Sequence, residues 1–213
     1  MIKNPTIKTI VNQPVTSNCY VVYKSNHCVV VDPGSEDAGE ILGWIERNEL
    51  VLDYIILTHE HFDHLWSVNE LRSNYPDTKL ICSGKCSERI QNRKRNFSVF
   101  YNGVGFESKR AEVEITKSVE TLEWDGETLV FILTPGHSEG SMCFYIESSN
   151  ALFTGDTLIP GLKTVTKLSG GDADKLKDSF AVLDKMFLHK NPFLYPGHDC
   201  GASYLESKEI SKK

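Results

Sequence analysis

The sequence predicts an α+β fold in which two β-sheets pack against each other and helices cover the outside. Three observations support this prediction. The chain has 213 residues, which suits one domain with a substantial core. Strand-like runs come first, then helices alternate with strands, and a second group of strands precedes a final helix and strand. One run, "LDYIILT", is continuously apolar, as in a strand buried on both faces.

The first part of the chain begins with strands and continues with a helix–strand alternation. The Asp32-Pro33-Gly34 turn ends the third strand. Apolar residues at helical spacing predict the two helices, and Pro76 marks the end of the second. The predicted elements are strands at 7–11, 19–24 and 28–32, a helix at 38–48, a strand at 52–58, a helix at 64–76 and a strand at 78–83.

In the second part, residues 84–112 combine a short basic helix with an aromatic, glycine-containing loop. The strongest helix covers 173–189, because its apolar residues recur in phase on one face. The tail after it is compatible with one further short helix. The predicted strands lie at 112–116, 128–134, 141–148, 151–155 and 192–197. We see no linker, so we expect one domain over residues 1–213.

Composition limits the possible partners and location. A net charge of −6 argues against a nucleic acid or an anionic membrane as the main partner. No apolar run approaches the roughly 20 residues that span a bilayer, and the first residues contain no apolar signal-peptide core. We therefore expect a cytoplasmic protein with a small-molecule substrate, and we leave its oligomeric state open. The six cysteines then predict free thiols, mostly buried as small apolar residues.

The heptapeptide "THEHFDH" places three histidines and two acids directly after the buried strand. His59 and His61 end this strand, and we expect Asp63 and His64 to begin the following helix. The four side chains can then converge at the strand–helix turn. Imidazole and carboxylate groups are suitable ligands for zinc, iron or manganese. Asp63 near a helix N-terminus would also interact favourably with the helix dipole.

Three more polar residues follow strands in the same manner. His137, Asp156 and His198 each come after a predicted strand, in a turn that contains glycine. Glycine lets the backbone bend tightly beside a metal site. A single histidine at a strand end, such as His27, is usually a surface or hydrogen-bonded residue. The joint pattern H-x-H-x-D-H, G-H, G-D and G-H is much more specific and predicts one shared metal site.

The motifs "THEHFDH", "TPGHSEGSMCFY", "LFTGDTLI" and "YPGHD" together resemble those of the metallo-β-lactamase superfamily. The resemblance covers most of the chain and implies an αββα sandwich with a metal centre at one edge of the sheets. It also implies two divalent metal ions. Zinc is favoured, and iron and manganese remain open. The implied ligands are His59, His61 and His137 for one ion, Asp63, His64 and His198 for the other, and Asp156 as a bridge between them.

Within this superfamily, "FTGDTLI" is similar to the glyoxalase II-like group of hydroxyacylglutathione hydrolases. The resemblance implies a thioesterase in which a metal-bridging hydroxide, oriented by Asp63, attacks the thioester carbonyl. Glu60 is expected to point away from the metals. Thr58, Ser138 and Asp32 are candidates to orient the imidazoles. Asp32 could equally be present only because it forms the turn.

Substrate contacts are less well defined by the sequence. By resemblance, Lys167 or Lys163 would meet a substrate carboxylate, although a solvated loop lysine is an equal explanation for each. Tyr101 is a further candidate, because residues 93–110 form either a lid over the metal pocket or a loop packed on the sandwich. Alternative functions are a persulfide dioxygenase-type iron oxidoreductase, and a lactonase or β-lactamase-like hydrolase.

Overall fold

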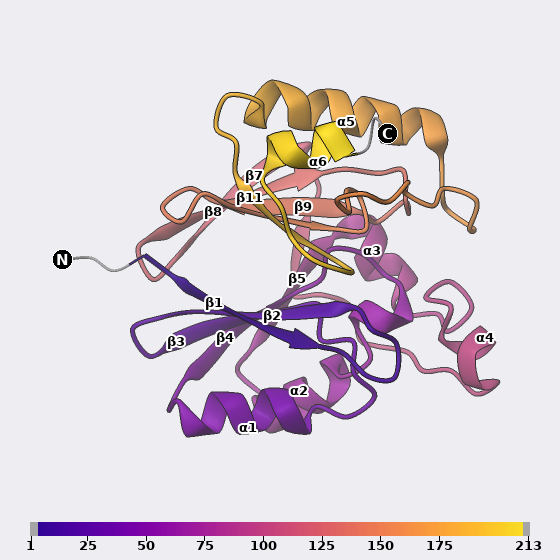
Figure 1. The fold of residues 1–213 in the computed structure, drawn as a ribbon. Helices are drawn as coiled ribbons and strands as arrows, with labels where there is room; N and C mark the ends of the chain where they lie inside the picture. The colour runs from indigo at the N-terminus through magenta and orange to yellow at the C-terminus, as the bar shows by residue number, and fades with distance from the viewer. Residues whose placement is uncertain (1–3, 211–213) are drawn as a thin grey trace.

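The computed structural model describes residues 4–210, which form two sheets packed face to face with helices on both outer faces (Figure 1). Two helices cover the sheet formed by the first part of the chain: α1 (Gly39–Arg47) and α2 (Val68–Asn74). Two others cover the second sheet: α5 (Ala173–Phe187) and α6 (Tyr204–Ile210). This arrangement confirms the predicted αββα sandwich. The predicted domain also includes residues 1–3 and 211–213, which lie outside the described residues.

The first sheet has the strand order β1-β2-β3-β4-β5-β6. The first three strands pair antiparallel, and β3 to β6 pair parallel. β3 and β4 therefore finish at the same end of the sheet. The bounds are β1 (Thr6–Val11), β2 (Asn18–Lys24), β3 (His27–Val31), β4 (Val51–Ile56), β5 (Lys79–Ser83) and β6 (Val113–Ile115).

The second sheet has the order β11-β10-β9-β8-β7. β10 and β11 are parallel, and the other neighbours are antiparallel, so β8, β10 and β11 all run in one direction. A bridge between Ser17 and His198 joins this sheet to the start of β2. The bounds are β7 (Val119–Trp124), β8 (Glu127–Leu133), β9 (Met142–Ile146), β10 (Ala151–Gly155) and β11 (Phe193–Pro196).

Two elements differ from the sequence prediction. β7 was not predicted, because its residues alternate between exposed and half-buried positions and include two glutamates. The Asp125-Gly126 pair, which has positive φ at both residues, is the hairpin signal that identifies this strand. The helix expected over 64–76 is also wrong at its start: Phe62–His64 form a 3₁₀ turn, and α2 begins only at Val68. Asp63 therefore does not lie at the N-terminus of an α-helix.

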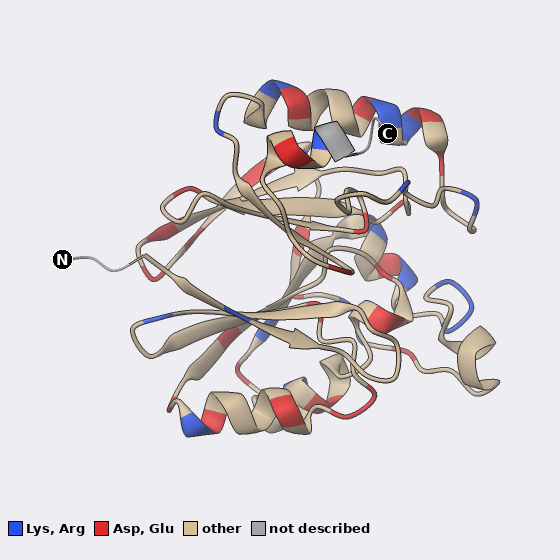
Figure 2. Cartoon of the chain, viewed as in Figure 1, with Lys and Arg blue, Asp and Glu red and all other residues tan. Residues whose placement is uncertain are grey.

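The segment between β5 and β6 contains two short helices, α3 (Gly84–Arg89) and α4 (Ser98–Asn102). α4 projects from the sandwich at the end where the connecting loops gather (Figure 1). α5 carries charges of both signs along its length (Figure 2). Within residues 4–210, no helix combines the length and the apolar character needed to cross a membrane.

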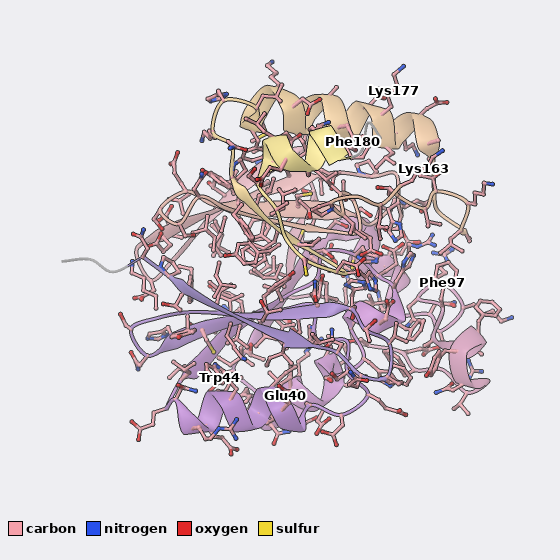
Figure 3. The ribbon with its side chains drawn as sticks, in the orientation of Figure 1. Glu40, Trp44, Phe97, Lys163, Lys177 and Phe180 are labelled. Carbon is pink, nitrogen blue, oxygen red and sulfur yellow. The ribbon has the colours of Figure 1, made fainter. Side chains whose placement is uncertain are left out.

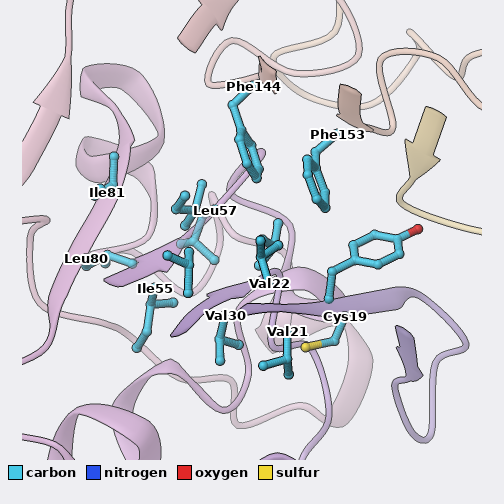
Figure 4. Close-up of a cluster of buried hydrophobic side chains, with 14 of the residues drawn as sticks. Cys19, Val21, Val22, Val30, Ile55, Leu57, Leu80, Ile81, Phe144 and Phe153 are labelled. Carbon is cyan, nitrogen blue, oxygen red and sulfur yellow. The ribbon is translucent and has the colours of Figure 1, made fainter. Parts of the chain in front are cut away.

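The main core fills the space between the two sheets (Figure 4). Phe144 and Phe153 extend from the second sheet toward Val22 and Leu57 of the first part of the chain. The two phenylalanine rings stack with centroids 4.3 Å apart. All six cysteines are free thiols, and all but Cys200 are buried, as expected for small apolar core residues.

We expect Phe144→Ala to lower the free energy of unfolding by about 3–5 kcal/mol, because it removes a buried ring and leaves a cavity between the sheets. Urea denaturation of both proteins measures this difference. Phe100→Ala is the control, since Phe100 is 72% exposed, and its effect should stay within about 0.5 kcal/mol. Equal effects of the two substitutions would contradict the assignment of the core.

Candidate metal centre

The seven histidine and aspartate residues singled out in the sequence converge where strands of both sheets finish. His59 and His61 follow β4 of the first sheet, and Asp63 and His64 lie in the 3₁₀ turn after them. The other three follow the second sheet's co-directional strands β8, β10 and β11. They are His137, Asp156 and His198. The strand directions therefore explain why residues distant in the chain meet at this end.

Two glycines permit the close approach of the chain segments. A Cβ on Gly197 would lie 2.1 Å from Oδ1 of Asp156 and 2.8 Å from Cε1 of His64. A Cβ on Gly155, which has φ of +47°, would lie 2.3 Å from Oγ1 of Thr58. Any side chain at either position would push the segments apart, so both turns require glycine.

His59, His61 and His137 form the first group of candidate ligands. Each offers a ligand atom within 4.8 Å of the others. Nε2 of His137 lies 3.0 Å from Nδ1 of His61. Two nitrogens bound to one tetrahedral zinc ion at about 2.0 Å lie roughly 3.3 Å apart, so this spacing is close to that of ligands on a shared ion.

Asp63, His64 and His198 form the second group, also with ligand atoms within 4.8 Å of one another. Oδ2 of Asp63 lies 3.6 Å from Nε2 of His64 and 3.4 Å from Nε2 of His198. Asp156 lies between the groups. Its Oδ2 is 3.5 Å from Nε2 of His137 and 3.6 Å from Nε2 of His198, and its Oδ1 is 3.5 Å from Nε2 of His64.

Hydrogen bonds at Nδ1 fix the orientation of four of the five imidazoles. Nδ1 of His137 lies 2.9 Å from the Val165 carbonyl, and Nδ1 of His198 lies 3.2 Å from the Thr16 carbonyl. A carbonyl oxygen only accepts hydrogen bonds, so both nitrogens carry the proton. The lone pair is then on Nε2, which faces the cluster.

Asp32 and Thr58 perform the same task for His64 and His59. Oδ2 of Asp32 lies 3.0 Å from Nδ1 of His64 and accepts a 2.6 Å hydrogen bond from the Thr58 hydroxyl. The Thr58 oxygen lies 3.0 Å from Nδ1 of His59. Asp32, His59 and His64 also lie close enough together to hold a metal ion. Asp32, however, contacts Nδ1 of His64, on the side of the ring away from Asp156. We therefore interpret Asp32 as an orienting residue, with φ of +50° at its turn.

The buried polar atoms of the cluster fit a bound cation. Nε2 of His59 and His64 and Oδ1 of Asp156 find no hydrogen-bond partner among residues 4–210. Such atoms are costly to bury unless something binds them. Burial also holds the pKa of His59, His61 and His137 below its ordinary value, which keeps these imidazoles neutral, as metal ligands must be.

The second group lies in a strongly negative environment. Burial lowers the pKa of His64, but Asp63, Asp156 and Asp32 outweigh it and raise this pKa to about 10. Burial raises the pKa of Asp63, and the surrounding histidines lower it below its ordinary value. These opposite shifts mean that the carboxylates favour positive charge at this point, which a divalent cation also supplies.

A pocket of about 380 Å³ opens beside the cluster. His137, Asp156 and His198 line it, together with Lys163 and Asp199. Lys163 extends from the loop over this end of the sandwich (Figure 3). Of the other two proposed substrate contacts, Lys167 is exposed outside this lining.

Tyr101 packs against Phe62 and Trp66, at ring distances of 5.1 and 5.3 Å, and also lies outside the lining of the pocket. Phe97 instead reaches the cluster, with its ring 4.9 Å from that of His61. Phe97 has φ of +65°, a conformation that is strained for a large side chain. The part of this segment that touches the site therefore precedes α4.

Glu60 points away from the candidate ligands, as expected. Its carboxylate accepts a 2.8 Å hydrogen bond from Ser138 and pairs with Arg89 at 2.6 Å. Ser138 thus contacts Glu60 and not an imidazole, contrary to its proposed role. Neither Arg89 nor the Val165 carbonyl was predicted, because Arg89 is one of several basic residues in residues 84–112 and the other is a backbone group.

Comparison with known proteins agrees with this geometry. A family model described as the metallo-β-lactamase superfamily matches residues 12–198. The probable metallo-hydrolase YqgX of Bacillus subtilis (strain 168) is 29% identical over 172 residues, which are 78% of this chain and 77% of that protein. A hydroxyacylglutathione hydrolase of Francisella tularensis subsp. novicida (strain U112) is 28% identical over 188 residues, which are 88% of this chain but 65% of that protein.

Solved structures show the same architecture. The crystal structure of the BLEG-1 B3 metallo-β-lactamase superposes with a TM-score of 0.87 at 28% identity, covering 96% of this chain and 97% of that one. The di-iron-bound form of TTHA1623 has a TM-score of 0.80 at 23% identity, covering 95% and 98%. The matched span 12–198 contains all seven converging residues. The chain belongs to the metallo-β-lactamase superfamily.

Proposed function

We propose that this superfamily hydrolase is a dinuclear, glyoxalase II-like thioesterase. The observation that carries the proposal is the convergence of two imidazole nitrogens, Nε2 of His59 and of His64, and Oδ1 of Asp156, all buried and without hydrogen-bond partners among the residues described. His59, His61 and His137 would hold one ion. Asp63, His64 and His198 would hold the other, and Asp156 would bridge them. Zinc suits these nitrogen and oxygen ligands, as do iron and manganese.

The reaction would convert a thioester and water into a carboxylate and a thiol. When bound, two divalent cations make hydroxide available at neutral pH and polarise the substrate carbonyl. Asp63 would orient the attacking water. Asp32, Thr58 and the Val165 carbonyl hold the imidazoles in place, so little rearrangement is needed during the reaction.

The pocket supports a small-molecule substrate, since about 380 Å³ lies within the usual range for such sites. Lys163 on its wall would contact a substrate carboxylate, and Lys167 and Tyr101 would act only after movement of their loops. The similarity to a hydroxyacylglutathione hydrolase supports the thioester class. Free thiols are typical of a reducing compartment, which supports a cytoplasmic location. A net charge of −6 supports the absence of a nucleic-acid partner.

A β-lactamase-like activity is the second candidate. BLEG-1, whose structure is described as a B3 metallo-β-lactamase, is 28% identical and nearly the same length as this chain. The same attacking water would serve a β-lactam or a lactone, with a different leaving group. Direct comparison of thioester, lactone and β-lactam hydrolysis separates the two candidates.

Elemental analysis tests the dinuclear site. We expect two ions per chain, with zinc preferred, after purification and equilibration with a mixture of zinc, iron and manganese. Asp156→Asn should reduce the metal content below two ions per chain, because it removes the charge of the carboxylate between the two ligand groups. His27→Ala is the matched control, since His27 pairs with Asp53 outside the cluster. A full complement of ions in Asp156→Asn would contradict the bridging role.

A substrate panel tests the reaction. We expect the metal-loaded protein to hydrolyse S-lactoylglutathione and simpler acyl thioesters, with thiol release followed by a thiol reagent, and to act more slowly on lactones and β-lactams. Chelation of the metal should abolish each activity. A protein with two ions that leaves all thioesters intact would contradict the proposal. Oxygen consumption by the iron-loaded protein with glutathione persulfide would instead support the dioxygenase alternative.

Asp32→Asn tests the orientation of His64. The amide cannot supply the charge that Oδ2 of Asp32 offers at 3.0 Å from Nδ1, so we expect roughly 10–100-fold weaker binding of one ion. Competition with a chromophoric chelator measures this affinity. Asp53→Asn is the control, because Asp53 makes the equivalent contact to Nδ1 of His27 at 2.8 Å. Unchanged affinity in Asp32→Asn would show that its place in the turn is its main role.

A further inference from the structure

A buried ion pair lies directly behind the first group of candidate ligands. Glu60 stands between His59 and His61 in the chain, and it is 0% exposed. Its Oε1 lies 2.6 Å from Nε of Arg89, which is 5% exposed and is the last residue of α3. The strand–turn segment that carries two of the histidines is thereby attached to a helix outside the metal centre.

The same carboxylate also holds the turn that carries His137. The Ser138 hydroxyl donates a 2.8 Å hydrogen bond to Oε2 of Glu60. Gly140 passes so close that a Cβ there would lie 2.3 Å from this oxygen. Glu60 therefore connects the turns of all three histidines without contacting any imidazole ring itself.

Arg89 extends the connection to the loop that lines the pocket, residues 157–171. One terminal nitrogen donates to the Ser169 carbonyl at 2.9 Å, and the other to Glu139 at 3.2 Å. The same loop supplies the Val165 carbonyl that lies 2.9 Å from Nδ1 of His137. The loop thus contacts the first ligand group twice, directly through Val165 and indirectly through Arg89.

The stability of the fold alone does not explain the buried pair of Glu60 and Arg89. Removing two charges from water costs several kcal/mol per ion in a protein interior, and apolar residues of similar volume often give equal or greater stability. A lysine could neutralise Glu60, but only a guanidinium presents donors in several fixed directions. Arg89 uses that property: its Nε pairs with Glu60, and its two terminal nitrogens donate to acceptors in two other segments.

We infer that Arg89 is a positioning residue for the three-histidine metal site, acting through Glu60 and Ser138 and linking that site to the pocket loop. The inference rests on the proposed function only in that two ions bind. Because binding energies at linked sites are reciprocal, a molecule that orders the pocket loop should also tighten the ion held by the three histidines.

Arg89→Lys tests the inference, because it keeps the positive charge beside Glu60 and loses the fixed set of donors. We expect one of the two ions to bind roughly 10–100-fold more weakly, as for other groups that orient metal ligands. The second ion should keep its wild-type affinity. Zinc titration against a chromophoric chelator gives both affinities, and thermal unfolding of the metal-free proteins reports any general loss of structure.

Arg95→Lys is the matched control. Arg95 pairs with Glu88 at the same 2.6 Å, but both side chains are about half exposed and lie outside the ligand network. The Arg95→Lys protein should bind both ions with wild-type affinity. Adding Asp32→Asn to Arg89→Lys should weaken both ions, since Asp32 contacts His64 of the other group directly.

Wild-type affinity for both ions in a folded Arg89→Lys protein would overturn the inference and leave Arg89 with a structural role. If this variant does not fold, Ser138→Ala takes its place, because it removes only the hydroxyl that joins Glu60 to the His137 turn. Weakening of one ion would support the inference, and unchanged affinities would overturn it. Failure of the proposed function is distinguishable, since the wild-type protein would then bind fewer than two ions or leave thioesters intact.

Discussion

The structure depends on the convergence of strand ends from two sheets at one edge of the sandwich. Parallel pairing of β3 with β4 and of β10 with β11 makes neighbouring strands finish together. Two hydrogen bonds fix the end of β11 against β2. The backbone N–H of Asn18 donates to the Gly197 carbonyl at 2.7 Å, and the Tyr20 hydroxyl donates to the Pro196 carbonyl at 2.6 Å. Seven histidine and aspartate residues can share one small volume only because these backbone segments are held together.

The price of this convergence is a set of buried polar groups that the protein satisfies in two ways. Nδ1 of four of the five histidines and the carboxylate of Asp32 find partners within the chain. The atoms on the inner side, such as Nε2 of His59 and Oδ1 of Asp156, find none among the residues described. An interior that satisfies the outer atoms and leaves the inner ones unpaired is organised around a cation.

The sequence predicted the sandwich and the converging residues because their signals are local. A histidine or an aspartate after a strand and beside a glycine can be read from a few neighbouring residues, as for Asp156 after Gly155. Most helices and strands were found by periodicity, while β7 was missed because an exposed edge strand lacks a clear apolar pattern. The start of α2 was misplaced because "HFDH" resembles a helix N-terminus but forms a 3₁₀ turn.

The supporting groups could not be predicted, since they depend on contacts between distant segments. Arg89 meets Glu60 across 29 positions (89 − 60), and the Val165 carbonyl reaches His137 from a loop without a regular pattern. A crystal structure of the zinc-loaded protein with anomalous scattering tests the central claim most directly. The account predicts two zinc peaks, one among His59, His61 and His137 and one among Asp63, His64 and His198, with Asp156 touching both. A single peak away from Asp156, or none in this cluster, would contradict it.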